Sequence, residues 1–129
     1  MPVNETILAT AVYDQLKQAM ASDPDGFIEL YREYLAEAWN TLHSLREAVQ
    51  QQNAQDASEK AHYLKGSSLV LGARVVARVA ARLQELALNG DARGAEAGLK
   101  QIEQALLELQ AELSDRLGAR VIPVRSTAA

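Results

Sequence analysis

The last part of the chain carries the pattern that most restricts how this sequence can fold. Between residues 99 and 117, large apolar side chains recur at steps of 3, 4, 3, 4 and 4. They belong to Leu99, Ile102, Leu106, Leu109, Leu113 and Leu117. Steps of three and four place all of them along one side of an α-helix. An apolar side of this length needs other elements to cover it, so the pattern predicts a core of packed helices.

Polar breaks and glycines divide the rest of the chain into further helices. Near the first break, Asp23 is a good N-cap and Pro24 suits the first helical turn. A second break falls at residues 50–53, where Asn53 is typical of an N-cap. Three glycines predict helix ends, namely Gly72, Gly90 and Gly118. The expected helices span about 5–21, 24–52, 54–71, 73–89 and 92–117.

The composition favours the same fold class. Leu and Ala supply most of the apolar surface, and with three prolines and no long β-branched run we expect no sheet. Short connections between helices favour antiparallel neighbours. We therefore expect an all-α fold, an antiparallel up-down four-helix bundle with an additional short N-terminal helix. One domain would span residues 1–118, and residues 119–129 would form a flexible C-terminal tail.

Charge and missing residue types argue against several classes of function. The chain has no cysteine, which excludes disulfides, thiolate metal sites and a cysteine nucleophile. No apolar run approaches the roughly 18 residues of a membrane span, and we identify no signal peptide. The net charge of −4 argues against nucleic-acid binding. Five basic residues and no acidic ones lie between Lys60 and Arg82, so this segment predicts an acidic partner.

One predicted helix presents a histidine on the side that faces away from the core. Its inward stripe comprises Ala57, Ala61, Leu64, Ser68 and Leu71. At about 100° per residue, His62 falls on the far side together with Gly66, and Lys65 lies at the edge of that side. Glycine inside a helix costs roughly 1 kcal/mol relative to alanine, and here it leaves the approach to the imidazole open. An accessible imidazole beside an ammonium suits a phosphoryl group carried on the histidine.

The residues around this histidine form a dense motif. Its positions are His62, Leu64, Lys65, Gly66, Ser67, Ser68, Gly72 and Ala73. The motif closely resembles the signature of histidine phosphotransfer (HPt) domains, the intermediates of bacterial, fungal and plant phosphorelays. The predicted helices extend this resemblance over about residues 5–117.

The resemblance implies a relay function without kinase activity of its own. His62 would accept a phosphoryl group from an aspartyl phosphate on the receiver domain of a hybrid sensor kinase and pass it to the receiver of a response regulator. Lys65 would steady the phosphoryl charge. The small residues expected to ease access and packing are Gly66, Ser67, Ser68 and Gly72. We expect no intrinsic cofactor, Mg²⁺ on the partner receiver, and a cytoplasmic monomer with no nucleic-acid or membrane partner.

The turn at Gly72 predicts which residues of the next helix lie near the histidine. A hairpin centred near residue 73 places Gln84 opposite His62, where its amide can hydrogen-bond one imidazole nitrogen and leave the other free. Many HPt domains carry a polar residue at this place. The candidates for a partner-docking surface are Leu69, Val70, Arg74 and Arg78. For the two apolar residues, packing against the N-terminal helix is the alternative.

Other chemistries fit this sequence less well. Glu59 and His62 have the Glu-x-x-His spacing of di-iron bundles, but such sites need a second motif and inward-facing ligands, so we expect no metal site. Ser67 and Ser68 diverge from His62 around the helix, and no glycine loop for phosphate is present. Two non-catalytic functions stay open. One is an adaptor that binds a receiver or a kinase without phosphate turnover, and the other is a helical oligomerisation module.

Overall fold

A computed structural model of the chain describes residues 6–124, and every regular element in that range is a helix. The α-helices are α1 (Thr10–Ala19), α2 (Pro24–Gln50), α3 (Ala54–Val70), α4 (Arg74–Leu88) and α5 (Ala92–Leu117). A short 3₁₀-helix, η1 (Ala119–Val121), follows them. The prediction of an all-helical chain is therefore confirmed for the described residues.

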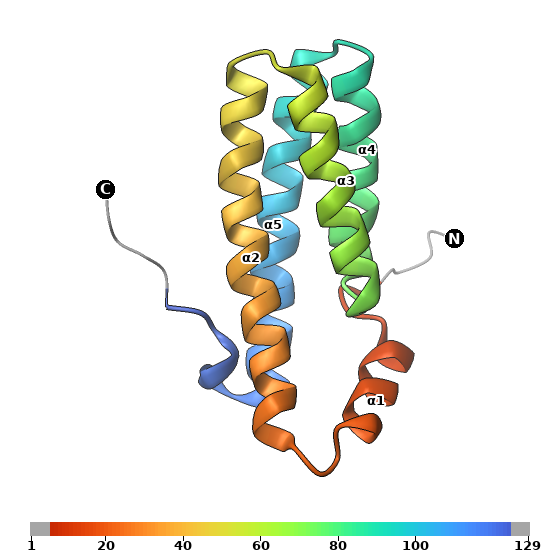
Figure 1. Cartoon of the computed structure of the whole chain (residues 1–129), viewed down its shortest axis with the longest axis vertical. Helices are drawn as coiled ribbons and strands as arrows, with labels where there is room; N and C mark the ends of the chain where they lie inside the picture. Colours follow the sequence, from red (N-terminus) through yellow and green to blue (C-terminus); the bar gives the residue numbers. More distant parts are fainter. Residues whose placement is uncertain (1–5, 125–129) are drawn as a thin grey trace.

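The four long helices lie side by side around a common core (Figure 1). In this view the chain runs up α2, down α3, up α4 and down α5. Each of these helices contacts the next, and α5 also contacts α2, so the four enclose the core. Helix α1 is shorter and contacts α2. Fully buried large side chains of the core include Tyr31, Leu35, Leu42, Leu45, Leu64, Leu83, Ile102, Leu106, Leu109 and Leu113.

Side-chain caps begin three of the long helices. The carboxylate of Asp23 accepts a hydrogen bond from the backbone N–H of residue 26 at 3.0 Å, as its position next to Pro24 predicts. Asn53 caps α3 in the same way at 3.1 Å, and Asp91 caps α5 at 2.8 Å. Each cap satisfies a backbone donor that has no partner within its own helix, which stabilises the helix by about 1 kcal/mol.

The turn between α3 and α4 depends on Gly72, which has a φ of +78°. The backbone N–H of Ala73 donates to the carbonyl of Ser68 at 2.9 Å and closes the end of α3. The carbonyl of Gly72 accepts a hydrogen bond from the N–H of Ala9 at 2.8 Å. A Cβ at residue 72 would lie 3.1 Å from the Cβ of Val12. Glycine is therefore required here both by the left-handed backbone and by the close approach of the N-terminal segment.

The N-terminal helix is shorter than the predicted span of 5–21. It begins at Thr10 and ends at Ala19. The hydrogen bond from Ala9 to Gly72 holds the preceding residues against the α3–α4 turn, so they do not continue the helix. Residue 5 lies outside the described residues. The buried side chain of α1 is Tyr13.

The prediction of a flexible tail after Gly118 is wrong for the residues that the structure describes. Residues 119–121 form η1, which contacts both α2 and α5. Val121 is fully buried, and the guanidinium of Arg120 lies 3.2 Å from the carboxylate of Asp25. Val121 and Pro123 are the buried residues after Gly118 in the described part of the chain, and two such residues make no periodic pattern. Residues 125–129 of the predicted tail lie outside the described residues.

Candidate functional site

Helix α3 presents His62 to solvent. The buried side of the helix is formed by Ala57, Ser58, Ala61, Leu64 and Ser68. His62 is exposed, as predicted, and no hydrogen bond or ion pair among residues 6–124 involves its side chain. A Cβ added at Gly66 would meet no heavy atom within 4 Å. The space in front of the imidazole is therefore open for a partner to approach.

Of the two polar residues predicted to assist the histidine, Lys65 lies on the same helix and Gln84 lies on the neighbouring helix α4. Lys65 is half-buried on α3, and its ammonium has no hydrogen bond or ion pair within residues 6–124, so its charge is available to an anion. Gln84 is half-buried on α4, which packs against α3. The predicted hydrogen bond from Gln84 to His62 is not formed within the described part of the chain. Its proposed role in orienting the ring stays a prediction.

The two serines after Gly66 serve packing and do not pair with the histidine. Ser67 is half-buried and donates to the carbonyl of Leu64 at 3.2 Å. Ser68 is fully buried, and its hydroxyl lies 2.6 Å from the hydroxyl of Tyr34 on α2. Burial raises the pKa of the Tyr34 hydroxyl, which therefore stays protonated. The periodicity of the sequence predicts Ser68 in the core stripe, but it does not indicate Tyr34 as its partner.

A groove of about 280 Å³ lies between α2 and α3, and its lining does not include His62. Its lining residues are Glu37, Asn40, Thr41, Ser44, Glu59, Lys60 and Tyr63. Tyr63 is exposed, and its hydroxyl donates to the carboxylate of Glu37, a hydrogen bond that raises the pKa of Tyr63. The two residues come from different helices, so no local spacing in the sequence indicates this pair.

Ion pairs offset part of the positive charge between residues 60 and 82. Lys60 lies 2.6 Å from the carboxylate of Asp56, and Arg82 lies 3.6 Å from that of Glu85. The guanidinium of Arg74 donates to the neutral carbonyl of residue 6 at 2.9 Å and keeps its charge. This segment is thus less positive than its own composition suggests, and Lys65 contributes charge close to the histidine.

Apolar side chains are exposed on α3 beyond the glycine. Leu69 and Val70 are 52% and 68% exposed. Packing against the N-terminal helix, the alternative explanation for these two residues, is therefore wrong. Arg74 and Arg78 are exposed on the first turns of α4. All four predicted docking residues are thus accessible on α3 and α4.

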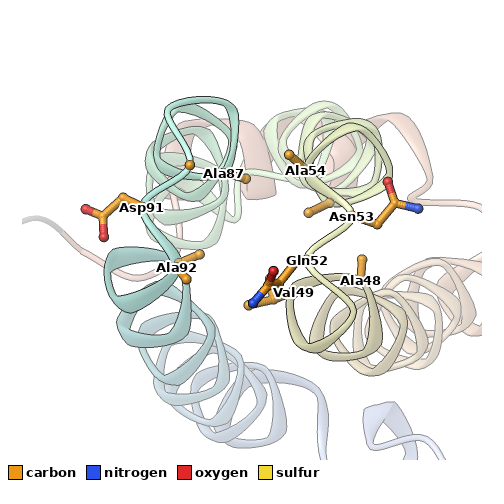
Figure 2. Close-up of a pocket in the computed structure, with 11 residues that line it drawn as sticks. Ala48, Val49, Gln52, Asn53, Ala54, Ala87, Asp91 and Ala92 are labelled. Atoms are coloured by element: carbon orange, nitrogen blue, oxygen red, sulfur yellow. The ribbon is translucent and has the colours of Figure 1, made fainter.

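The described residues form neither a metal-binding cluster nor a membrane-spanning helix. No group of three or more His, Asp or Glu side chains between residues 6 and 124 is arranged to hold a metal ion. None of the helices in this range is long and apolar enough to cross a membrane. A cavity of about 320 Å³ lies between the ends of the long helices, but its lining does not include His62 (Figure 2).

Comparison with known proteins supports a specific family. A family model described as Hpt domain matches residues 29–112. The crystal structure of histidine-containing phosphotransfer protein B (HptB) from Pseudomonas aeruginosa PAO1 superposes with a TM-score of 0.80 at 25% identity, covering 88% of this chain and 96% of that chain. A rice protein assigned as a histidine-containing phosphotransfer protein superposes with a TM-score of 0.79 at 17% identity, covering 89% and 84%, which supports the fold alone. No curated relative matches the chain.

The matched region spans more than half of the chain and contains the whole motif around His62. Proteins of this family are phosphorelay intermediates of two-component systems and are not kinases. The structural match to HptB covers 96% of that protein, so the fold agrees with the family whose model matches. The chain belongs to the Hpt domain family.

Proposed function

We propose that His62 accepts a phosphoryl group from an aspartyl phosphate on one receiver domain and passes it to an aspartate on another. The observation that supports this most directly is the exposed imidazole, which has no partner among residues 6–124 and faces open space at Gly66. An imidazole with this exposure can reach a phosphorus atom held in a partner protein.

The transfer step follows from the chemistry of an acyl phosphate. A lone pair on one imidazole nitrogen of His62 attacks phosphorus, a P–N bond forms, and the P–O bond to the partner's aspartate breaks. The carboxylate leaves with the bonding electrons, and the second ring nitrogen keeps its proton. The reverse sequence on a second receiver regenerates the free imidazole. Charge on the transferring group is stabilised mainly by Mg²⁺ in the receiver, as phosphoryl transfer requires.

In this proposal the chain supplies a rigid nucleophile and a docking surface. The antiparallel up-down four-helix bundle, with its additional N-terminal helix, holds α3 in place. Lys65 balances the charge of the phosphorylated imidazole, and Gln84 orients the ring. Docking involves Leu69, Val70, Arg74 and Arg78, which are exposed on α3 and α4. We further propose that the protein works as a monomer in the cytoplasm, with receiver domains as its partners.

Labelled phosphate tests the proposal. Isolated receiver domains, charged with acetyl phosphate and Mg²⁺, are mixed with the wild-type protein, with His62→Gln and with His43→Gln. His43 is a matched control because it is also a solvent-exposed helical histidine, with an ion-pair geometry to Glu47 at 3.1 Å. We expect acid-labile, alkali-stable label on the wild type and on His43→Gln, and none on His62→Gln.

Two other outcomes change the assignment. Receivers that bind the wild-type protein but transfer no label to it favour the adaptor function. Label that persists on His62→Gln places the phosphoryl group on another residue and overturns the role of His62.

A further inference from the structure

Helix α3 is held by small side chains. Four of its five buried residues are alanines or serines, namely Ala57, Ser58, Ala61 and Ser68. Such side chains interdigitate little with a neighbouring helix, so they resist rotation of α3 about its own axis less than large side chains do. Helix α5, by contrast, buries Leu99, Ile102, Leu106, Leu109 and Leu113. Directional contacts to a neighbouring helix would therefore add a restraint on the rotation of the helix that carries the nucleophile.

Two tyrosines of α2 supply directional contacts to the end of α3. The hydroxyl of Tyr34 lies 2.6 Å from the hydroxyl of Ser68, and both groups are buried. One turn away, the hydroxyl of Tyr31 donates to the backbone carbonyl of Leu71 at 3.0 Å, and Tyr31 is also fully buried. Because a hydrogen bond weakens steeply when its angle changes, this pair of contacts defines which side of α3 faces α2.

The position of Ser68 relative to His62 determines what these contacts control. Six residues separate them, which is about 9 Å along the axis and about 120° around it. Holding Ser68 toward the core therefore holds His62 toward solvent. A side chain about 6 Å from the helix axis moves by about 1 Å for every 10° of rotation. A displacement of that size in a reacting group can reduce a rate by roughly 100-fold.

We propose that Tyr34 and Ser68 are positioning residues that fix the rotation of α3 and thereby aim the imidazole of His62 at the partner's phosphoryl group. This inference rests on the proposed relay function. The two residues do not touch the reacting atoms, and they act through the orientation of the helix. Tyr31 supports the same restraint through the carbonyl of Leu71.

The test compares Tyr34→Phe, Ser68→Ala and the double variant with the wild type. Each single variant removes one hydroxyl of the pair and should slow transfer from a phosphorylated receiver domain at saturating concentration roughly 10-fold. The double variant should be no slower than the single variants, because both act on one contact. The receiver concentration for half-maximal rate should not change. Phosphoramidate is a small phosphoryl donor that needs only an exposed imidazole. The rate at which it phosphorylates each variant should stay within about twofold of the wild-type rate.

A variant of matched stability separates positioning from loss of stability. Ile102→Val on α5 removes one methylene from the core without touching α3's tyrosine contacts, and it should leave the transfer rate unchanged. If Tyr34→Phe and Ser68→Ala also transfer at the wild-type rate, the positioning role is overturned while the relay function stands. If none of the receiver domains transfers a phosphoryl group to or from the wild-type protein, the relay function is overturned. The positioning role is then overturned with it.

Discussion

The two ends of the helix bundle are closed by side chains of very different size, and His62, the middle residue of α3, lies between them. At the end near α1, Tyr13, Phe27 and Tyr31 form an aromatic cluster with ring centroids 5.3 to 5.8 Å apart. The guanidinium of Arg116 lies 4.9 Å from the centre of the Tyr13 ring, and Val121 is buried at the same end. We call this the aromatic end.

At the opposite end, α2, α3, α4 and α5 surround a cavity of about 320 Å³ (Figure 2). Its lining residues are Ala48, Val49, Gln52, Asn53, Ala54, Ala57, Ala87, Gly90, Asp91, Ala92 and Ala95. We call this the alanine end. The difference indicates that stabilising packing is concentrated at the aromatic end, where the tyrosines also hold the last turn of α3.

Truncation in the aromatic cluster should have the largest effect on stability. Phe27 is buried and contacts both Tyr13 and Tyr31, so Phe27→Ala removes a large apolar area and leaves a cavity. We expect a loss of about 3–5 kcal/mol in the free energy of unfolding. Urea unfolding followed by the fluorescence of Trp39 measures it.

The control for this truncation lies at the alanine end. Val49→Ala removes a buried side chain that already borders the cavity, so it should cost less than half as much as Phe27→Ala. Equal losses at the two ends would contradict the uneven distribution of packing.

Alkaline pH should destabilise the protein through the two buried tyrosines of α2, Tyr31 at the aromatic end and Tyr34 one turn further along. Burial raises the pKa of Tyr31 and of Tyr34 above the ordinary value of 10.0. Above about pH 10 the unfolded chain releases these protons while the folded protein keeps them, so stability is complete below that pH and falls as the pH rises. Each tyrosine should lower the free energy of unfolding by about 1.4 kcal/mol per pH unit. Urea unfolding at a series of pH values measures the slope, and Tyr34→Phe should make it shallower. An unchanged slope in that variant would show that Tyr34 ionises normally.

The features that could be predicted from sequence are local or periodic. The regular steps of Leu99 to Leu117 give the buried side of α5, and Asp23 and Asn53 cap the helices that their positions indicate. Gly72 ends α3 because a left-handed residue is needed there. The exposure of His62 follows from the same periodicity. Each of these depends on residues within about one helical turn of one another.

Contacts between helices could not be predicted in the same way. The partners Tyr34 and Ser68 are 34 residues apart, and Glu37 and Tyr63 are 26 apart. A periodic pattern shows which side of a helix faces inward. It does not give the relative rotation of two helices precisely enough to show which side chains form a hydrogen bond. For the same reason, the hairpin register placed Gln84 on the correct neighbouring helix but predicted a hydrogen bond that the described residues do not form.

Filling the alanine end should stabilise the protein. Ala87 is buried in the last turn of α4 and lines the cavity, so Ala87→Leu adds apolar volume where space exists (Figure 2). A buried methylene contributes about 0.8 kcal/mol, and part of this gain is offset by lost side-chain freedom, so we expect a net gain of about 1 kcal/mol. Thermal and urea unfolding check the gain. A loss of stability would mean that the helix ends close over this space in solution.

The smallest expected effect concerns the backbone at the alanine end. Gln52 has a φ of +57°, the left-handed region that side chains other than glycine adopt at a cost. Gln52→Gly relieves this strain but gives the unfolded chain more conformational freedom. We therefore expect the free energy of unfolding, measured with urea, to rise by about 0.5 kcal/mol.

The neighbouring residue is the matched control for that change. Gln51 has an ordinary φ of −82°, so Gln51→Gly should only lose stability, by about 0.5–1 kcal/mol. If Gln52→Gly lost as much as Gln51→Gly, the Gln52 side chain, which lines the cavity in Figure 2, would be contributing packing that outweighs its backbone strain. The alanine end would then be partly closed by this glutamine, and the contrast between the two ends would be smaller than the burial of their side chains indicates.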